Sequence, residues 1–338
     1  MNRLTSLRTG STPGVAVEIA TGRVSAASLE WRGQQPVIAA HATETIPDSA
    51  LVPSLTAANT HDRATVVAAL GRVLERTGRP KRIGLVVPDV VAKVSLVKFE
   101  KVPPREKDLD QLVRWQVRKT APFPIEEAQV TYVPGLRAAD GQEYIVSLAR
   151  RSVVEEYEQL CAEAGAHAGI VDLATFNVVN AVLAGAAAPD ADPPAGSGSS
   201  RAPSRDDWLL VNVAAEYASI AILRGPHVIF FRNRVADTDG TLADLVHQTA
   251  MYYEDRLKGA GFARVVLAGA SSAGARQAGD IDEFRRSLQD RLATAVETVD
   301  PRGAAALTDR IAAAPTLLDT LAPLVGLLLR DQGEVVNA

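Results

Sequence analysis

LLVNVAAEYASIAILRG, residues Leu209 to Gly225, reads as a strand, a tight turn and a second strand. Apolar side chains fill both arms, and the turn Ala214-Ala215-Glu216-Tyr217 separates them. In many nucleotide-binding proteins a turn of this kind holds backbone N–H groups against a phosphate. Here the turn contains no glycine and adds the carboxylate of Glu216. The stretch predicts a hairpin, and it raises the question of whether that hairpin binds a nucleotide.

The order of elements around this hairpin occurs twice in the chain. Each copy reads as three strands, a helix and a buried strand, which predicts two layered α/β units. The first copy comprises Gly14–Ala20, Arg23–Trp31, Pro36–Glu44, a helix capped by Asp62 and ended by Gly78, and Ile83–Pro88. The second comprises Trp208–Ala214, Ser219–Gly225, His227–Val235, a helix over Thr241–Lys258, and Arg264–Ala270.

A different pattern separates the two copies. It predicts a strand, a helix and two paired strands, followed by a helix and a strand that return to the first unit. The predicted elements are Val90–Val102, Arg105–Thr120, Ala128–Val133, Glu143–Ala149, Val153–Ala164 and Gly169–Leu173. Residues 186–207 are rich in Pro, Gly, Ser and Asp, which predicts a disordered linker.

Composition limits the class of protein. The 338 residues are 47% hydrophobic and 22% charged, which suits two soluble domains with full cores. A net charge of −4 argues against broad nucleic-acid binding. Cys161 has no second cysteine to pair with, which is typical of a reducing compartment. The first residues lack the apolar core of a secretory signal. The apolar stretch Ile311–Leu329 is a poor membrane span, because Pro315, Asp319 and Pro323 interrupt it. We therefore expect a cytoplasmic protein that reaches a membrane only through a partner.

No pattern of catalytic or metal-binding residues stands out. The five histidines lack metal-ligand spacing, and no nucleophile, base and oxyanion site can be assembled. GASSAGAR, Gly269–Arg276, has the glycines of a phosphate loop but lacks its Lys-Ser/Thr. Cys161 lies in the middle of a predicted helix and is expected to be a core residue. We predict no catalytic residue and no metal site.

Three stretches resemble the PilM family, the actin-like proteins of type IV pilus machines and of related secretion systems. They are VPDVVAKVSLVKFEKVPPREKDLDQLVRWQVRKTAPFPIEEA, VNVAAEYASIAILRGPHVIFFRNR and LAPLVGLLLR. The resemblance extends from about residue 14 to residue 330 and implies a duplicated actin-like ATPase fold. It implies a first domain of residues 12–89, 150–185 and 314–330, an inserted peptide-docking module of residues 90–149, and a second domain of residues 208–313. That second domain lacks most of the helical subdomain that the family inserts after its third strand.

The resemblance also implies a cleft that holds ATP in the family, with Asp and Gly in its turns. The remnants of this nucleotide site are Glu18, Thr21, Gly22, Asn212, Ala214 and Gly269. Asn212 and Ala214 stand where the family has Asp and Gly, so we expect a degenerate site and no cofactor. The alternative is an actin-like ATPase that binds ATP with Mg²⁺, its site lined by Glu18, Thr21 and Asn212.

By the same resemblance, the chain is expected to be a non-catalytic scaffold that binds the N-terminal peptide of a PilN-like membrane protein. Other inner-membrane and motor components of the pilus are further expected partners. The residues predicted to bind the peptide are Val94, Leu96, Val97, Leu112, Trp115, Arg118 and Phe123. In the alternative interpretation Trp115 and Phe123 are the module's own core. The basic residues Arg105, Lys107, Arg114, Arg118 and Lys119 are either a solvated helix face or a surface for acidic lipid headgroups or an acidic partner.

Overall fold

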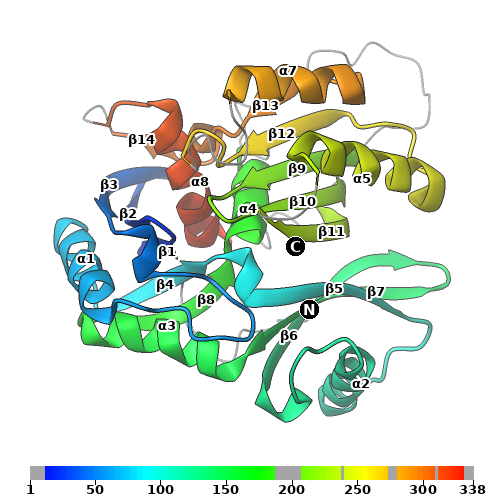
Figure 1. The fold of residues 1–338 in the computed structure, drawn as a ribbon, viewed down its shortest axis with the longest axis horizontal. Helices are drawn as coiled ribbons and strands as arrows, with labels where there is room; N and C mark the ends of the chain where they lie inside the picture. Colours follow the sequence, from blue (N-terminus) through cyan, green and yellow to red (C-terminus); the bar gives the residue numbers. More distant parts are fainter. Residues whose placement is uncertain (1–11, 187–206, 237–239, 273–279, 309–310, 331–338) are drawn as a thin grey trace.

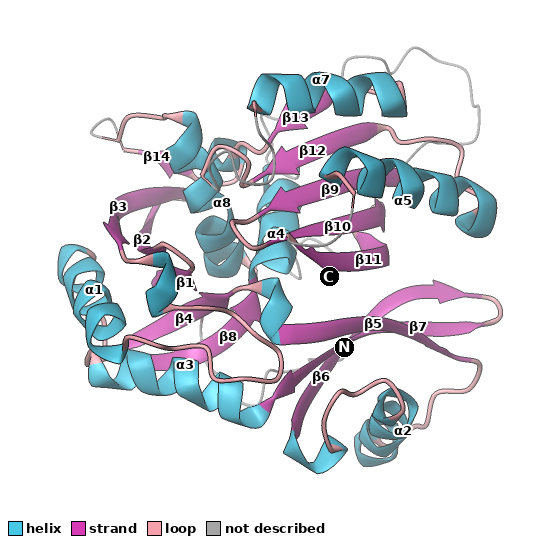
Figure 2. Cartoon of the chain, viewed as in Figure 1, coloured by secondary structure: helices cyan, strands magenta, loops and turns pink. Residues whose placement is uncertain are grey.

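The computed structural model describes residues 12–186, 207–236, 240–272, 280–308 and 311–330. Two sheets form the two halves of the molecule, and a third, smaller sheet lies beside them (Figures 1 and 2). The first sheet has the order β14-β3-β2-β1-β4-β8, and the second has the order β11-β10-β9-β12-β13. Their strands are β1 Val15–Ala20, β2 Arg23–Arg32, β3 Gln35–Thr45, β4 Arg82–Val87, β8 His167–Leu173, β9 Asp207–Val213, β10 Tyr217–Arg224, β11 His227–Val235, β12 Arg264–Ala268, β13 Val296–Thr298 and β14 Ala306–Leu307.

The predicted duplication is confirmed by strand pairing. In each half, three antiparallel strands are followed by a helix and by a fourth strand that lies parallel to the first. Those helices are α1 Arg63–Arg76, whose N-cap is Asp62 as expected, and α5 Leu242–Leu257, whose N-cap is Thr241. This topology is that of the actin-like ATPase fold.

Four further helices complete the layers. Helices α3 Arg151–Glu163 and α7 Ile281–Leu292 lie with α1 and α5 on the outer faces of the two sheets, while α4 Ala174–Ala186 and α8 Pro315–Leu329 lie between the sheets (Figure 1). Small residues let α8 approach closely. A Cβ atom at Gly326 would lie 1.6 Å from the carbonyl oxygen of Asn177 in α4, and one at Gly84 would lie 2.6 Å from the Leu327 side chain.

The inserted module has the predicted order of a strand, a helix and two strands. It comprises β5 Ala92–Phe99, α2 Glu106–Arg118, β6 Ala128–Ala138 and β7 Gly141–Arg150, with the sheet order β5-β7-β6. Alternation along the strands gives the sheet two faces, and α2 covers one of them. The module's own core lies under α2 and contains Val97, Val113, Val117 and Tyr144.

Two boundary predictions are wrong. Asp207 is not linker but the first residue of β9, where it pairs with Arg224 at 2.7 Å. Residues 306–307 do not belong to the second domain, because they form β14, which pairs with β3 of the first sheet. Ala186, at the other end of the predicted linker, is the last residue of helix α4, and residues 187–206 lie outside the described residues. None of the described helices is long and apolar enough to span a bilayer.

Candidate functional site: an interdomain cleft and a neighbouring groove

Buried polar side chains gather where the two sheets face each other. The parallel strands β1, β4 and β8 of one sheet and β9 and β12 of the other end at this junction, which is where ligands bind in open α/β sheets. We call this junction the cleft; its polar side chains are buried. The six predicted nucleotide-site residues lie here, at the ends of β1, β9 and β12. The buried polar residues include Glu18, Thr21, Asp89, Thr175, Asn212, Ser219 and Asp319.

Asp89 is the centre of this cleft. It lies in a short helical turn after β4 and accepts hydrogen bonds from the backbone N–H and the hydroxyl of Thr175 and, at 2.6 Å, from the hydroxyl of Ser219. The Asn212 amide donates to the Thr175 hydroxyl at 2.8 Å, and the Asn233 amide donates to the Ser219 hydroxyl at 2.9 Å. Burial raises the pKa of Asp89 above its ordinary value, although the donors from Ser219 and Thr175 oppose that rise. The network therefore joins the two domains through neutral donors.

The first hairpin uses its carboxylate within the chain. Glu18 accepts from the guanidinium of Arg23 on the neighbouring strand at 2.9 Å. The Thr21 hydroxyl donates to the carbonyl of Leu51, and Gly22 takes a φ of +77° in the β1–β2 turn. A carboxylate neutralised in this way is a poor ligand for a hydrated Mg²⁺.

The glycine of the turn after β12 and the turn of the second hairpin both have structural roles. Gly269 follows β12 with a φ of +75°, and a Cβ atom there would lie 2.1 Å from the carbonyl oxygen of Val213. The Ala214 N–H donates to Tyr217 across the predicted turn at 2.8 Å. Both positions are therefore explained by the packing of the strand ends.

Asp319 occupies the turn that follows β12. Its carboxylate accepts from the backbone N–H of Gly269 at 3.0 Å and from that of Ser271 at 2.7 Å. Burial raises the pKa of Asp319, and these backbone donors partly oppose the rise. The N–H groups of this turn could bind an anion, and the carboxylate of Asp319 in helix α8 is the anion that they bind. The sequence carried a signal for it, since Asp319 is the sole charged residue of Pro315–Leu329.

A groove lies next to the cleft, beside the start of the inserted module. It has a volume of about 510 Å³ and runs between β5 and β11, each of which is an edge strand of its sheet. Phe231 of β11 packs on Phe176 of α4, with ring centroids 5.2 Å apart. The lining residues are Pro53, Ser54, Leu55, Thr56, Val90, Ala92, Lys93, Val94, Phe231, Asn233 and Val235.

The loop wall of this groove, residues 53–56, is held in place by a buried asparagine. The Asn59 side chain accepts from the Ser54 N–H at 3.0 Å and donates to the carbonyls of Ser54 and Ala57. Arg150, at the end of β7, donates to the Thr56 carbonyl at 2.6 Å. Sequence reasoning missed this loop because it has no periodic pattern.

The seven predicted peptide-binding residues do not form one surface. Val94 lines the groove, and Leu96 lies on the same face of β5, opposite Ile145. Val97 points the other way and is buried under α2, where Leu112 and Phe123 pack at the edge of the same core. Trp115 is 63% exposed and Arg118 is exposed, both on α2. The seven residues therefore do not line one groove together. The alternative that Trp115 and Phe123 are core residues is wrong for Trp115, whereas Phe123 does pack against the module core.

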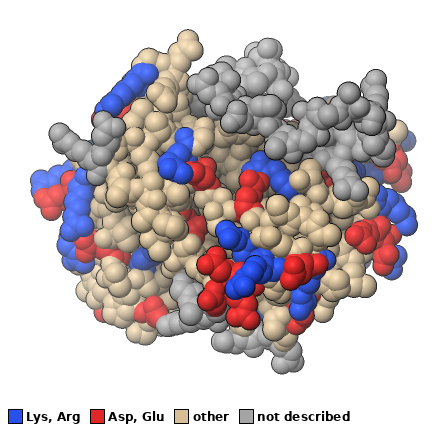
Figure 3. Space-filling view, turned by 90° about the horizontal axis from the view of Figure 1, so that it is seen from above, with Lys and Arg blue, Asp and Glu red and all other residues tan. Residues whose placement is uncertain are grey.

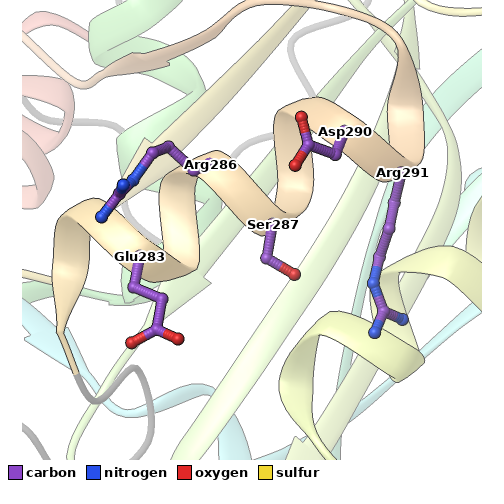
Figure 4. Close-up of a pocket in the computed structure, with 5 residues that line it drawn as sticks. All are labelled: Glu283, Arg286, Ser287, Asp290 and Arg291. Atoms are coloured by element: carbon purple, nitrogen blue, oxygen red, sulfur yellow. The ribbon is translucent and has the colours of Figure 1, made fainter.

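The remaining candidate sites are a cysteine, groups of possible metal ligands and a second cavity. Cys161 is buried in the core of the first domain, and burial raises the pKa of its thiol to about 12. No group of three His, Cys, Asp or Glu side chains suited to a metal ion occurs in the described residues. A second cavity involves only side chains of α7, and Figure 4 shows Arg291 pointing to α5, where it pairs with Asp244 at 2.7 Å. Acidic and basic side chains are interspersed on the face seen in Figure 3.

Comparison with known proteins identifies the family. The family model of the type IV pilus assembly protein PilM matches residues 16–256. The chain belongs to the PilM family. A role in type IV pilus assembly follows from that membership, and the resemblance seen in the sequence is confirmed. No curated protein sequence matches the chain significantly.

A solved structure shows the same fold, and two others are reported as weaker similarities. A PilM–PilN type IV pilus biogenesis complex aligns with a TM-score of 0.73 at 18% identity, covering 94% of this chain and 98% of that chain. A Bacteroides thetaiotaomicron protein with an actin-like ATPase fold and unknown function aligns with a TM-score of 0.48 at 10% identity, covering 83% and 89%. The cytoplasmic domain of EpsL, from the type II secretion system of Vibrio cholerae, gives 0.45 at 9% identity, covering 75% and 80%.

Proposed function

We propose that this chain is a non-catalytic scaffold at the cytoplasmic face of the inner membrane, in the assembly complex of a type IV pilus or a related secretion system. It binds the N-terminal peptide of a PilN-like membrane protein in the groove between β5 and β11. One observation carries this proposal: a single cavity is lined by residues of two edge strands, several of which are apolar.

An extended peptide fits such a groove for a physical reason. An edge strand leaves a row of backbone N–H and C=O groups to pair with another chain, and alternate side chains of that chain then enter pockets. Val94, Phe231 and Val235 provide apolar contacts, while Lys93 and Asn233 provide polar ones. The similarity to a structure of PilM bound to PilN supports a partner of this kind.

The proposal includes no cofactor, because the cleft residues do not fit ATP with Mg²⁺. Glu18 is paired with Arg23, Asp89 accepts from Thr175 and Ser219, and the turn after β12 already binds the Asp319 carboxylate. A bound nucleotide would have to displace these contacts, and each displaced group would lose its partner in a buried site. The rival function, an actin-like ATPase, rests on the fold alone.

Titration calorimetry with a synthetic N-terminal peptide of the PilN-like partner tests the proposal. Leu55→Asp, in the loop wall, and Val94→Asp should each weaken binding at least tenfold, because each places a charge in the groove. Val102→Asp, at an exposed position beyond the far end of β5, is the matched control and should bind normally. Equal affinity in all three variants would rule out the groove.

A thermal-shift titration with Mg-ATP tests the rival function. Ligand at a hundred times its dissociation constant stabilises a protein by about 2.7 kcal/mol, so an ATP-binding chain would melt at a clearly higher temperature. We expect no shift. Micromolar affinity in calorimetry would overturn the non-catalytic interpretation and direct attention to Glu18 and Thr21.

A further inference from the structure

Helix α2 carries an exposed tryptophan that neither the cleft nor the groove uses. Leu109, Val113 and Val117 turn one side of α2 into the module core. Trp115 lies two residues from both Val113 and Val117, which places it about 200° around the helix, on the opposite side. At 63%, it is the most exposed large hydrophobic side chain of the described residues.

Cations surround this tryptophan on the same side of the helix. We call Lys107, Gln111, Trp115, Arg118 and Lys119 the α2 outer face; all five are exposed and follow i, i+4, i+8, i+11 and i+12 spacing. Within the described part of the chain, neither Lys107, Arg118 nor Lys119 forms an ion pair. By contrast, Arg114, nearer the sheet, is paired with Asp110 at 2.9 Å. Asp108 is the carboxylate that shares the outer face.

The exposure and charge of this face favour a lipid surface. Neither of the two described cavities is lined by an α2 residue. A tryptophan on an exposed helix face that also carries Lys107, Arg118 and Lys119 matches a bilayer surface, where the indole ring lies among the headgroups and Lys and Arg meet anionic phosphates.

We propose that the α2 outer face binds the surface of an anionic phospholipid bilayer. This inference rests on the proposed function in one respect: a partner peptide that holds the chain beside the membrane makes a weak lipid contact sufficient, because the effective concentration is high. The contact would orient the module relative to the membrane and is separate from the groove.

Vesicle flotation of the full chain tests the proposal. The chain should float with phosphatidylglycerol-containing vesicles at low salt, and not with pure phosphatidylcholine vesicles or at high salt. Trp115→Ala and the double variant Arg118→Gln/Lys119→Gln should each lower the bound fraction at least fivefold. Trp31→Ala is the matched control, because Trp31 is also exposed, at 47%, but lies at the β2–β3 hairpin of the first domain.

Tryptophan fluorescence gives a second readout. The chain has three tryptophans, and Trp208 is buried, so the Trp31→Phe variant leaves Trp115 as the exposed one. Its emission should shift to the blue when phosphatidylglycerol vesicles are added, and the emission of the Trp115→Phe variant should not.

Failure of this inference can be told apart from failure of the proposed function. Trp115→Ala should retain full affinity for the partner peptide. If it lost peptide affinity while vesicle binding was unchanged, or if the unaltered chain did not float, the bilayer assignment would be overturned. If the unaltered chain floated but did not bind the peptide, the groove assignment alone would fail.

Discussion

The cleft and the groove use neighbouring residues of the chain, but they differ in how their polar groups are paired. Asp89 points into the cleft, where Thr175 and Ser219 donate to it, and Val90 lines the groove. In the cleft, side chains satisfy one another. The groove is bordered by β5 and β11, each of which has a strand paired to it on one side alone within the described sheets. This difference supports the proposal above that the cleft is structural and that the groove binds the partner peptide.

Asn233 belongs to both regions. Its amide donates to the Ser219 hydroxyl of the cleft network, and the same residue lines the groove. The network therefore supports one wall of the groove. This link can be tested, because a substitution that disrupts the cleft network should also weaken peptide binding in the groove.

Gly326→Ala is expected to have the largest effect, because it separates the helices that lie between the two sheets. The new methyl would meet the Asn177 carbonyl at 1.6 Å, so α4 and α8 must move apart. Urea unfolding should show a loss of more than about 3 kcal/mol. Gly71→Ala is the matched control: Gly71 lies inside α1, a Cβ added there would have no atom within 4 Å, and alanine should be neutral or stabilising. Similar losses in both would contradict the tight α4–α8 packing.

Asp89→Ala should cost about 3 kcal/mol of unfolding free energy, because it leaves the Thr175 and Ser219 donors buried without an acceptor. It should also weaken peptide binding through Asn233. Asp89→Asn keeps an acceptor oxygen and should lose less. An Asp89→Ala chain with native stability would mean that the cleft network is not a structural element.

Asn212→Asp introduces the carboxylate that the resemblance implies at this position, and we expect it not to create a nucleotide site. The change removes the amide that donates to Thr175 at 2.8 Å and brings a second carboxylate near Asp89. We expect a loss of about 2 kcal/mol in stability and no Mg-ATP binding by calorimetry. Adding Ala214→Gly should not change that result. Micromolar binding in the double variant would show that two substitutions alone separate the cleft from an active one.

The periodic parts of this fold could be predicted from the sequence. His227–Val235 is a strand with the predicted bounds, and the cap residue Asp62 begins α1 as expected. The alternation of side chains along a strand also tells which face of the sheet each residue occupies. Val94 and Leu96 share one face of β5, and Val97 lies on the other. In the same way, helical spacing separates Trp115 from the module core.

Contacts between distant segments could not be predicted in this way. Ser219 donates to Asp89 across 130 residues, and nothing local marks the two as partners. The groove wall near Asn59 has no period, and β14, at two residues, is too short to produce one. The loss of the nucleotide turns therefore stays a prediction, and the hydrogen-bond network of the cleft could not be predicted from local patterns.

Asn59→Ala should loosen the groove wall more than the fold. The variant loses the hydrogen bonds to Ser54 and Ala57 and an acceptor for the Tyr157 hydroxyl, so we expect about 1–2 kcal/mol of destabilisation. Peptide affinity should fall about tenfold, because a disordered loop must be fixed again on binding. Ser54→Ala, which removes only exposed hydrogen bonds to Thr56 and Ala57, is the milder control. Unchanged affinity in Asn59→Ala would remove loop 53–56 from the binding site.

Asp244→Asn should have the smallest effect on stability. It measures how much a charged side chain outside the cleft and the groove contributes to the free energy of unfolding. Asp244 caps α5 with Thr241 and accepts from Arg291 of α7 at 2.7 Å. The Thr241 hydroxyl, followed by Arg291, lowers the pKa of Asp244 from 3.8 to about 2. Because the folded-state pKa is the lower one, its stabilisation is present above about pH 4 and is lost as the pH falls toward 2.

At pH 7 the asparagine variant should therefore melt a few degrees lower at most, since surface ion pairs contribute little. The difference from the unaltered chain should shrink steadily below pH 4 in a series of thermal melts. Buried Asp89 should behave in the opposite sense, because its pKa is raised and protonation favours the folded state. A constant Asp244→Asn difference across this pH range would show that the helix cap works through geometry, without help from the charge.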